Sequence, residues 1–339
     1  MPKYEFPKVE LHLHLDGSIP PETMWKLMIS EGIDLPIATY EQFLTWLKET
    51  ADCRDVNHYL ERFELPLQIL QTKENLALVT EKLIDVLASQ NYRYAEIRFA
   101  PQLHLRRGMT QRDAIDAVLE GRKRGEENNP GIKTGIILCA MSIGPETLNM
   151  EENLETVRLT KEYLGKGVCA CDLAGAEGIV PLKNFHPIFD LARTLDIPFT
   201  CHAGDSQMCD TIIDALDFGT KRIGHGHHIY NDNSLWKRAT DNGVTLEICP
   251  TSNIQCSTQP SYEEHPAKKL FDAGIRITIN TDNMTLAAVT LDDEYDHCLN
   301  EMGFSYNDLI KMNIYATEAL FTDEDEKQTI IKELEEYFK

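Results

Sequence analysis

The chain has no apolar run close to the roughly 20 residues that a membrane-spanning helix needs. Its opening segment, Met-Pro-Lys-Tyr-Glu-Phe-Pro-Lys, has no apolar core of signal-peptide length. Internal repeats, low-complexity tracts and long linkers are also lacking. We therefore expect a folded cytoplasmic protein that does not act on a membrane.

Positive charge is in short supply. The 339 residues include 33 Lys and Arg against 55 Asp and Glu, which gives a net charge of −22. Such an excess of negative charge repels the phosphates of nucleic acids and the surface of anionic membranes. We expect a neutral small molecule as the partner and no nucleic acid, while the composition leaves the oligomeric state open.

Cysteine pairs with zinc-site spacing are missing as well. The nine cysteines are odd in number, and five of them lie in apolar, strand-like stretches: Cys139, Cys169, Cys171, Cys201 and Cys249. The Cys169-Ala170-Cys171 pair has no second pair with which to complete a zinc site. Because a buried free thiol acts as a small hydrophobic group, we expect reduced thiols in the core.

The chain does contain eight short apolar segments that are typical of β-strands. From the second segment onward they recur roughly every 25 to 40 residues, with amphipathic helical stretches between them. Alternating strands and helices predict a parallel sheet, and eight such units predict an α/β fold, a (β/α)8 TIM barrel built as one domain over residues 1–339. The predicted strands are 9–15, 92–100, 133–140, 168–174, 198–202, 222–228, 245–249 and 276–280.

The first interval between strands is longer than the others. It holds several helical stretches, of which only the last is needed to return the chain to the barrel. We interpret residues 18–72 as a helical insertion after the first strand, on the face where barrel active sites lie, and expect a lid. The acidic segment 322–339 carries apolar residues at helical spacing, which predicts a C-terminal helix that docks on the barrel.

The first predicted strand carries His12 and His14, two residues apart. Residues i and i+2 of a strand point to the same face, so both imidazoles converge on one side. This pair indicates a metal site at the end of the strand, although one such pair also fits two half-buried histidines with ordinary hydrogen bonds.

Polar side chains follow several other predicted strands. Because the active sites of barrels lie at the C-terminal strand ends, we expect these side chains to gather in one site. They are Asp16 after the first strand, Asp172 and Glu177 at the fourth, His202 and Asp205 at the fifth, His225, His227 and His228 at the sixth, and Asp282 and Asn283 after the eighth.

Six motifs carry these residues: His-Leu-His-Leu-Asp-Gly-Ser, Asp-Leu-Ala-Gly-x-Glu, His-Ala-Gly, Arg-Ile-Gly-His-Gly-x-His, Glu-x-Cys-Pro-x-Ser-Asn and Asn-Thr-Asp. With them the chain resembles the adenosine deaminase family, within the amidohydrolase-type barrels, over nearly its whole length. The resemblance implies hydrolytic deamination of adenosine or 2′-deoxyadenosine at C6 to inosine or 2′-deoxyinosine and ammonia, a reaction of purine salvage.

The resemblance also implies a role for each motif residue. One zinc ion per chain would be held by His12, His14, His202 and Asp282, with Asp282 also counted as catalytic together with Asp205 and His225. His225 would orient the metal-bound water and take its proton. The purine nucleoside would be bound by His14, by Asp16 at the ribose 5′-hydroxyl, by the Gly175 backbone at N3 and by Asn283.

Elementary chemistry supports this set of ligands. Three imidazoles and one carboxylate suit Zn²⁺ and leave an open position for water, whose pKa a zinc ion brings to about 7. The predicted fourth strand contains no lysine that could bridge a second metal, and the family pattern gives Asp172 a structural role. We therefore favour one metal ion, with Asp172 as the alternative further ligand.

Two residues depart from the pattern of the family. Asp205 stands where the family has the glutamate that protonates N1, and its side chain is one methylene, about 1 Å, shorter. Asn283 stands where the family has a second aspartate that hydrogen-bonds N7. An asparagine amide can donate to N7 without an unusual pKa, so this change is compatible with a purine.

The departures leave three interpretations open. The first is an adenosine or 2′-deoxyadenosine deaminase with an altered site. The second is a deaminase of the same fold for another aminopurine, such as adenine, an N6-substituted purine or a modified nucleoside. The third is a weakly catalytic, zinc-containing barrel that binds purines. The sequence gives no role to Asn253 or to His265, and it makes His228 a candidate support for the site.

Overall fold

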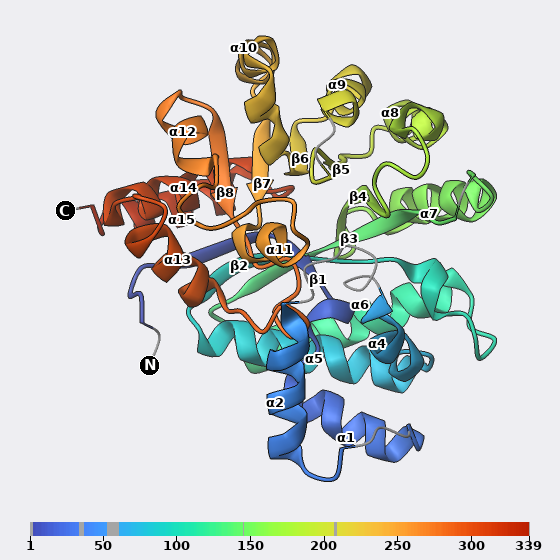
Figure 1. Cartoon of the computed structure of the whole chain (residues 1–339). Helices are drawn as coiled ribbons and strands as arrows, with labels where there is room; N and C mark the ends of the chain where they lie inside the picture. Colours follow the sequence, from blue (N-terminus) through green and yellow to red (C-terminus); the bar gives the residue numbers. More distant parts are fainter. Residues whose placement is uncertain (1–2, 34–36, 53–60, 145, 207–208, 339) are drawn as a thin grey trace.

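The structure, a computed structural model, describes residues 3–33, 37–52, 61–144, 146–206 and 209–338 (Figure 1). Within these residues eight parallel strands form two four-stranded sheets, in the orders β1-β2-β3-β4 and β5-β6-β7-β8. The strands are β1 (Lys8–His14), β2 (Tyr92–Phe99), β3 (Lys133–Ser142), β4 (Val168–Gly175), β5 (Cys201–Ala203), β6 (Arg222–His225), β7 (Thr245–Ile248) and β8 (Arg276–Ile279).

Backbone hydrogen bonds join the two sheets at both of their edges. Between β4 and the residues before β5, the amide of Cys171 donates to the carbonyl of Pro198 (3.0 Å). Between β1 and the residues after β8, the amide of His14 donates to Asp282 (2.7 Å) and that of Asp282 donates to His12 (2.9 Å). The predicted α/β fold, a (β/α)8 TIM barrel, is confirmed.

The strands are buried on both faces, which is why the sequence shows them as short apolar runs. In β1, Val9, Leu11 and Leu13 alternate with Glu10 and His12, and each of the five is at most 1% exposed. Alternate residues of a strand point to opposite faces. The apolar set therefore belongs to the hydrophobic core, while the polar set of this strand faces the other way.

Helices connect successive strands and surround the sheets in Figure 1. Between β1 and β2 lie α1 (Pro21–Glu31), α2 (Tyr40–Ala51), α4 (Glu64–Ile69) and α5 (Lys73–Ser89). The others are α6 (Gln111–Asn128), α7 (Met150–Tyr163), α8 (His186–Thr194), α9 (Cys209–Phe218), α10 (Asn233–Asp241), α11 (Pro250–Gln255), α12 (Ala267–Asp272), α13 (Leu291–Asn300), α14 (Tyr306–Ala319) and α15 (Glu324–Glu335). In the described ranges, no helix combines the length and the apolar character needed to span a membrane.

The segment between β1 and β2 is helical, as the sequence predicts. In Figure 1, α1 and α2 project away from the strands at the bottom of the view. The side chain of Thr39 caps α2 by accepting the Gln42 amide (3.3 Å). Residues 34–36 and 53–60 of the predicted insertion lie outside the described residues, and the lid stays a prediction. At the other end of the chain, Ile330 and Leu334 of α15 are fully buried.

Two predicted strands differ from the observed strands by three residues at one end, whereas the other six agree within two residues. The segment predicted over 222–228 is a strand only to His225, because Gly226 takes a φ of +69° and His227–Asn231 form a short 3-10 helix. The strand predicted over 198–202 begins at Cys201 and ends at Ala203. The turn at Gly226 leaves His225 as the last residue of its strand, where a barrel carries its active site.

Candidate metal centre and active site

A cavity of about 400 Å³ lies at the C-terminal ends of the strands. It is lined by all but one of the residues that the family resemblance assigns as metal ligands, catalytic groups or substrate contacts: His14, Asp16, Gly175, His202, Asp205, His225, Asp282 and Asn283. The remaining one, His12, is fully buried and does not line the cavity. Residues that lie up to about 270 positions apart in the sequence therefore meet at one end of the barrel.

Four of these side chains bring their donor atoms together. Asp282 Oδ1 lies 3.5 Å from His12 Nε2 and 3.4 Å from His14 Nε2, and His14 Nε2 lies 3.2 Å from His202 Nε2. Bonds of about 2.05 Å to a tetrahedral metal ion place neighbouring ligand atoms about 3.3 Å apart. His12 Nε2 is buried and has no hydrogen-bond partner among the described residues. The donor set therefore fits a bound metal ion.

Carboxylates hold two of the imidazoles from behind. His12 Nδ1 lies 2.9 Å from Glu247 Oε2, and His202 Nδ1 lies 3.0 Å from Asp172 Oδ2. An Nδ1–H that donates to a carboxylate leaves the lone pair on Nε2, which is the tautomer that a metal ligand needs. The sequence analysis named Asp172 as a candidate but gave Glu247 no role, although Glu247 is the first residue of the Glu-x-Cys-Pro-x-Ser-Asn motif.

One arginine joins both of these carboxylates. Arg98 is fully buried and donates to Asp172 Oδ2 (2.9 Å) and to Glu247 Oε2 (2.8 Å). Its Nη2 also donates to the carbonyl of Leu11 (2.6 Å). Arg222 donates to the other oxygen of Glu247 (2.6 Å). Buried carboxylates need such partners, because a buried charge without one is costly.

The surroundings set the protonation states of the donors. Burial lowers the pKa of His12 to about 4 and puts the pKa of His14 well below its usual value. Burial alone would raise the pKa of Asp282, but the nearby imidazoles of His12 and His14 hold it well below its usual range. Ser252 also donates to Asp282 Oδ2 (2.7 Å). His12 and His14 are therefore neutral rings beside an ionised carboxylate, which are the forms that bind a cation, whereas Asp172 raises the pKa of His202 against the effect of burial.

A second polar group faces the same cavity from another side. Asp205 Oδ1 accepts a hydrogen bond from Asn253 Nδ2 (2.7 Å) and lies 3.6 Å from His225 Nδ1. Burial raises the pKa of Asp205 against the effect of His225, and Glu177 and Asp282 raise it further. The environment therefore makes this carboxyl hold its proton more tightly than an exposed aspartate does.

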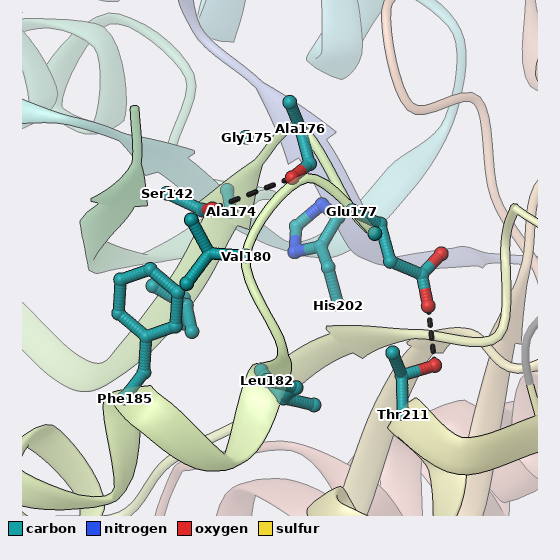
Figure 2. A pocket seen from close by; sticks show the side chains of 12 residues that line it. Ser142, Ala174, Gly175, Ala176, Glu177, Val180, Leu182, Phe185, His202 and Thr211 are labelled. Atoms are coloured by element: carbon teal, nitrogen blue, oxygen red, sulfur yellow. Dashed lines mark hydrogen bonds between the residues drawn. The ribbon is translucent and has the colours of Figure 1, made fainter. Parts of the chain in front are cut away.

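Glu177 fixes the loop that carries Asp205. Its carboxylate accepts the amides of Gly204 (2.6 Å), Asp205 (2.8 Å) and Ser206 (2.7 Å). It also accepts the hydroxyl of Thr211, as Figure 2 shows. Figure 2 views a smaller cavity of about 20 Å³ beside the first one, which Glu177 also lines. Three backbone donors aimed at one carboxylate hold the chain after β5 in a defined path.

Glycines make room at two positions of the site. A Cβ on Gly17 would lie 1.7 Å from Asn283 Oδ1, so the turn after β1 accepts Asn283 only with glycine there. Gly175 has a φ of +107°, and a Cβ on it would lie 2.5 Å from the carbonyl oxygen of Ser142. Asp16, the neighbour of Gly17 in the sequence, is also buried, and this burial raises the pKa of its carboxyl to about 6.

The side chain of His228, the candidate support for the site, contacts the backbone of the loop after β5. Its Nδ1 lies 3.1 Å from the carbonyl of Gly204. It does not line the cavity. Asn253, which the sequence left without a role, is buried next to Asp205 and His225. His265, also without a role in the sequence, is buried next to Asn253.

Comparison with known proteins gives a consistent result. The family model described as adenosine deaminase matches residues 7–337. An adenosine deaminase of Haemophilus ducreyi is 37% identical over 97% of this chain and 96% of its own. Among solved structures, an adenine deaminase from Arthrobacter aurescens has a TM-score of 0.87 at 24% identity, with 98% of each chain covered. A zinc-bound amidohydrolase from Burkholderia ambifaria has a TM-score of 0.85 at 23% identity, with 98% of this chain and 91% of its own covered; these two likenesses concern the fold.

Proposed function

The chain belongs to the adenosine deaminase family of aminohydrolases, and we propose that it uses one zinc ion to convert adenosine and 2′-deoxyadenosine into the inosine compounds and ammonia. The observation that carries the proposal is the convergence of three imidazoles and one carboxylate, with three pairs of donor atoms 3.2 to 3.5 Å apart, beside a cavity that also holds a half-buried acid. A cavity of about 400 Å³ is within the usual range for a small-molecule site.

We assign the zinc ion to His12, His14, His202 and Asp282. When bound, the ion supplies the Lewis acidity that makes water a nucleophile at neutral pH. Glu247 and Asp172 hold the rings of His12 and His202 in the required tautomer.

We assign Asp205 as the acid that gives a proton to purine N1. Burial raises its pKa, so it binds a proton more readily than an exposed aspartate does, and the amides bound by Glu177 hold its loop in place. Protonation of N1 lets the ring accept the electron pair of the attacking oxygen at C6. His225 lies beside Asp205 and acts on the side of the attacking water.

The rest of the purine nucleoside meets groups around the cavity. We assign the Gly175 amide to N3, Asp16 to the ribose 5′-hydroxyl and the Asn283 amide to N7. An amide N–H donates to N7, which is an acceptor. His14 completes the assigned contacts.

A deaminase of another aminopurine is the second candidate. It is favoured by Asp205 and Asn283, the two departures from the family pattern, both of which line the cavity. A shorter acid at N1 and a permanent donor at N7 change the shape and polarity of the site at two points of the ring. A weakly catalytic purine-binding barrel would follow if the shorter acid failed to reach N1.

A substrate panel with the zinc-loaded protein tests the proposal. We expect about one zinc per chain by metal analysis and the ultraviolet change of deamination with adenosine and 2′-deoxyadenosine. A His202→Ala variant should lose metal and activity together, whereas Lys237→Ala, on the exposed face of α10, should keep both. A zinc-loaded protein that is inert to both nucleosides would contradict the first assignment. Turnover of adenine or of an N6-substituted purine would then favour the second candidate, and binding without turnover would favour the third.

A further inference from the structure

Asn253 of α11 lies against both proton-carrying side chains of the site. Its side chain is fully buried. Its Nδ2 lies 2.7 Å from Asp205 Oδ1 and 3.1 Å from His225 Nδ1. Its Oδ1 lies 3.2 Å from Nε2 of His265, which is also buried. These contacts form one hydrogen-bonded series that runs from His265 through Asn253 to His225 and Asp205. The atom that donates in each contact determines where the protons of His225 and Asp205 lie.

The direction of the series is set by a backbone amide. The N–H of Ala267 donates to His265 Nδ1 (3.2 Å). Because a backbone N–H can only donate, His265 Nδ1 carries a lone pair and the ring proton must be on Nε2. Burial lowers the pKa of His265 to about 3, so the ring is neutral with a single proton. His265 Nε2–H therefore donates to the oxygen of Asn253.

With its oxygen turned to His265, Asn253 presents its amide hydrogens to the active site. Both atoms that face Nδ2 must then accept. His225 Nδ1 accepts, so a neutral His225 carries its proton on Nε2. Asp205 Oδ1 also accepts, together with a contact from the Thr258 hydroxyl (3.4 Å), so a neutral Asp205 carries its proton on Oδ2.

We propose that Asn253, oriented by His265, is a positioning residue that places one proton on His225 Nε2 and the acid proton on Asp205 Oδ2. The inference rests on the proposed function, because it concerns the acid and the histidine of that reaction. With the proton on Oδ2, Asp205 donates through the oxygen that Asn253 leaves open. With the proton on Nε2, His225 enters the reaction as a hydrogen-bond donor. In this tautomer Nε2 has no free lone pair, so it cannot accept the proton of water, which would require the other tautomer.

Ring ¹⁵N chemical shifts of the zinc-loaded wild-type protein test the proton positions directly. In protein labelled with ¹⁵N-histidine, the signals of His225 are those that disappear in His225→Gln. We expect His225 with an unprotonated Nδ1 and a protonated Nε2, and His265 with the same tautomer. A protonated Nδ1 on neutral His225 would overturn the proposal. This measurement does not depend on turnover, so it separates failure of the inference from failure of the proposed function.

Asn253→Ala tests the consequence for catalysis. It removes the donor to both groups, and we expect kcat to fall about 100-fold with KM within threefold and zinc content unchanged. Asn242→Ala, at the exposed end of α10, is the matched control, since the side chain of Asn242 donates to the carbonyl of Arg238 and lies outside the site. We expect this control to lose less than threefold in kcat. Equal losses in the two variants, or full activity in Asn253→Ala, would contradict the role.

His265→Phe tests whether His265 acts through Asn253. We expect a loss of about tenfold in kcat, because Asn253 is then free to turn. The double variant Asn253→Ala/His265→Phe should be no worse than Asn253→Ala, since both changes break one series. Additive losses would show that His265 acts separately and would overturn that part of the proposal. Circular dichroism and zinc analysis of each variant exclude misfolding as the cause.

Discussion

Asp205 combines burial, a raised pKa and a fixed loop, which together suit a general acid. Its carboxyl is reached by Asn253 and His225 and by no described lysine or arginine within ion-pair distance. A cation there would hold the carboxyl ionised and remove the proton that the reaction needs. Because Asp205 is one methylene shorter than the glutamate of the family, N1 of the purine must lie correspondingly closer to the loop after β5 for the proton transfer to occur.

Removal of this acid gives the first prediction. We expect Asp205→Ala to lower kcat by at least about 100-fold, because general acid catalysis contributes about 10²–10⁴. Asp205→Asn keeps the size and the contact with Asn253 but has no acid proton, so its kcat should fall equally. Steady-state kinetics on zinc-loaded variants measure both. Full activity in either variant would contradict the assignment.

Asn283 leads to a prediction about the ligand. The 7-deaza analogue of adenosine lacks the N7 acceptor, so it should bind about fivefold more weakly than the parent, which matches a net hydrogen bond of about 1 kcal/mol. The measurement compares the inhibition constant of 7-deazaadenosine, determined against adenosine turnover, with the binding constant of adenosine. In Asn283→Ala the two ligands should bind alike. Equal binding to the wild-type protein would argue against the contact.

Individual strands contribute different parts of the metal centre. β1 carries His12 and His14, β5 carries His202, and the segment that follows β8 carries Asp282. Behind them, β2 places Arg98 between the carboxylates of β4 and β7. Five strands are therefore coupled through side chains as well as through the sheet. A disturbance of Arg98 in β2 is expected to reach ligands on β1 and β5.

Arg98→Lys tests this coupling between strands. A lysine keeps the positive charge but cannot bind two carboxylates with a planar fork. We expect zinc affinity to fall about 10- to 100-fold, the usual cost of losing a partner behind the ligands. Competition with a chelator measures it without reference to activity. Arg276→Lys, in a partly exposed ion pair at the start of β8, is the control and should keep its affinity. Unchanged affinity in Arg98→Lys would contradict the coupling.

At the scale of the whole molecule, a buried glutamate makes the free energy of unfolding depend on pH. Glu294 of α13 is fully buried, and its Oε1 accepts the amide of Thr251 at the start of α11 (3.0 Å). Burial raises its pKa from 4.5 to about 8. Between these values the folded protein keeps the proton while the unfolded chain releases it. Stability contributed by this group is therefore complete below pH 4.5 and is lost as the pH rises toward 8.

Glu294→Gln should remove this dependence. The variant cannot ionise, so its Tm relative to wild type should increase steadily between pH 5 and pH 8. Thermal unfolding followed by circular dichroism, at several pH values in metal-free buffer, measures the difference. Glu335→Gln on the exposed face of α15 is the control and should show no such trend. A constant or falling difference for Glu294→Gln would contradict the prediction.

Much of the fold and part of the site follow from the sequence. The spacing of His12 and His14 predicted a shared face because side chains alternate along a strand. The polar residues after the strands predicted one site because parallel strands of a barrel end at the same face. The strand predicted over 222–228 was wrong beyond His225, since a positive φ at Gly226 is a local conformation that apolar patterning does not reveal. The helical lid over 18–72 and the cytoplasmic location stay predictions.

The sequence by itself determined which residues carry the chemistry, since their identity and their place after strands are local properties. Only the tertiary structure decided which partners control them. Glu247 meets His12 across 235 residues, Arg98 bridges to it across 149, and His265 orients Asn253 through the amide of Ala267. These contacts depend on how strands and loops pack around the barrel axis. The direction of a hydrogen bond, and therefore the position of a proton, is fixed only once such neighbours are in place.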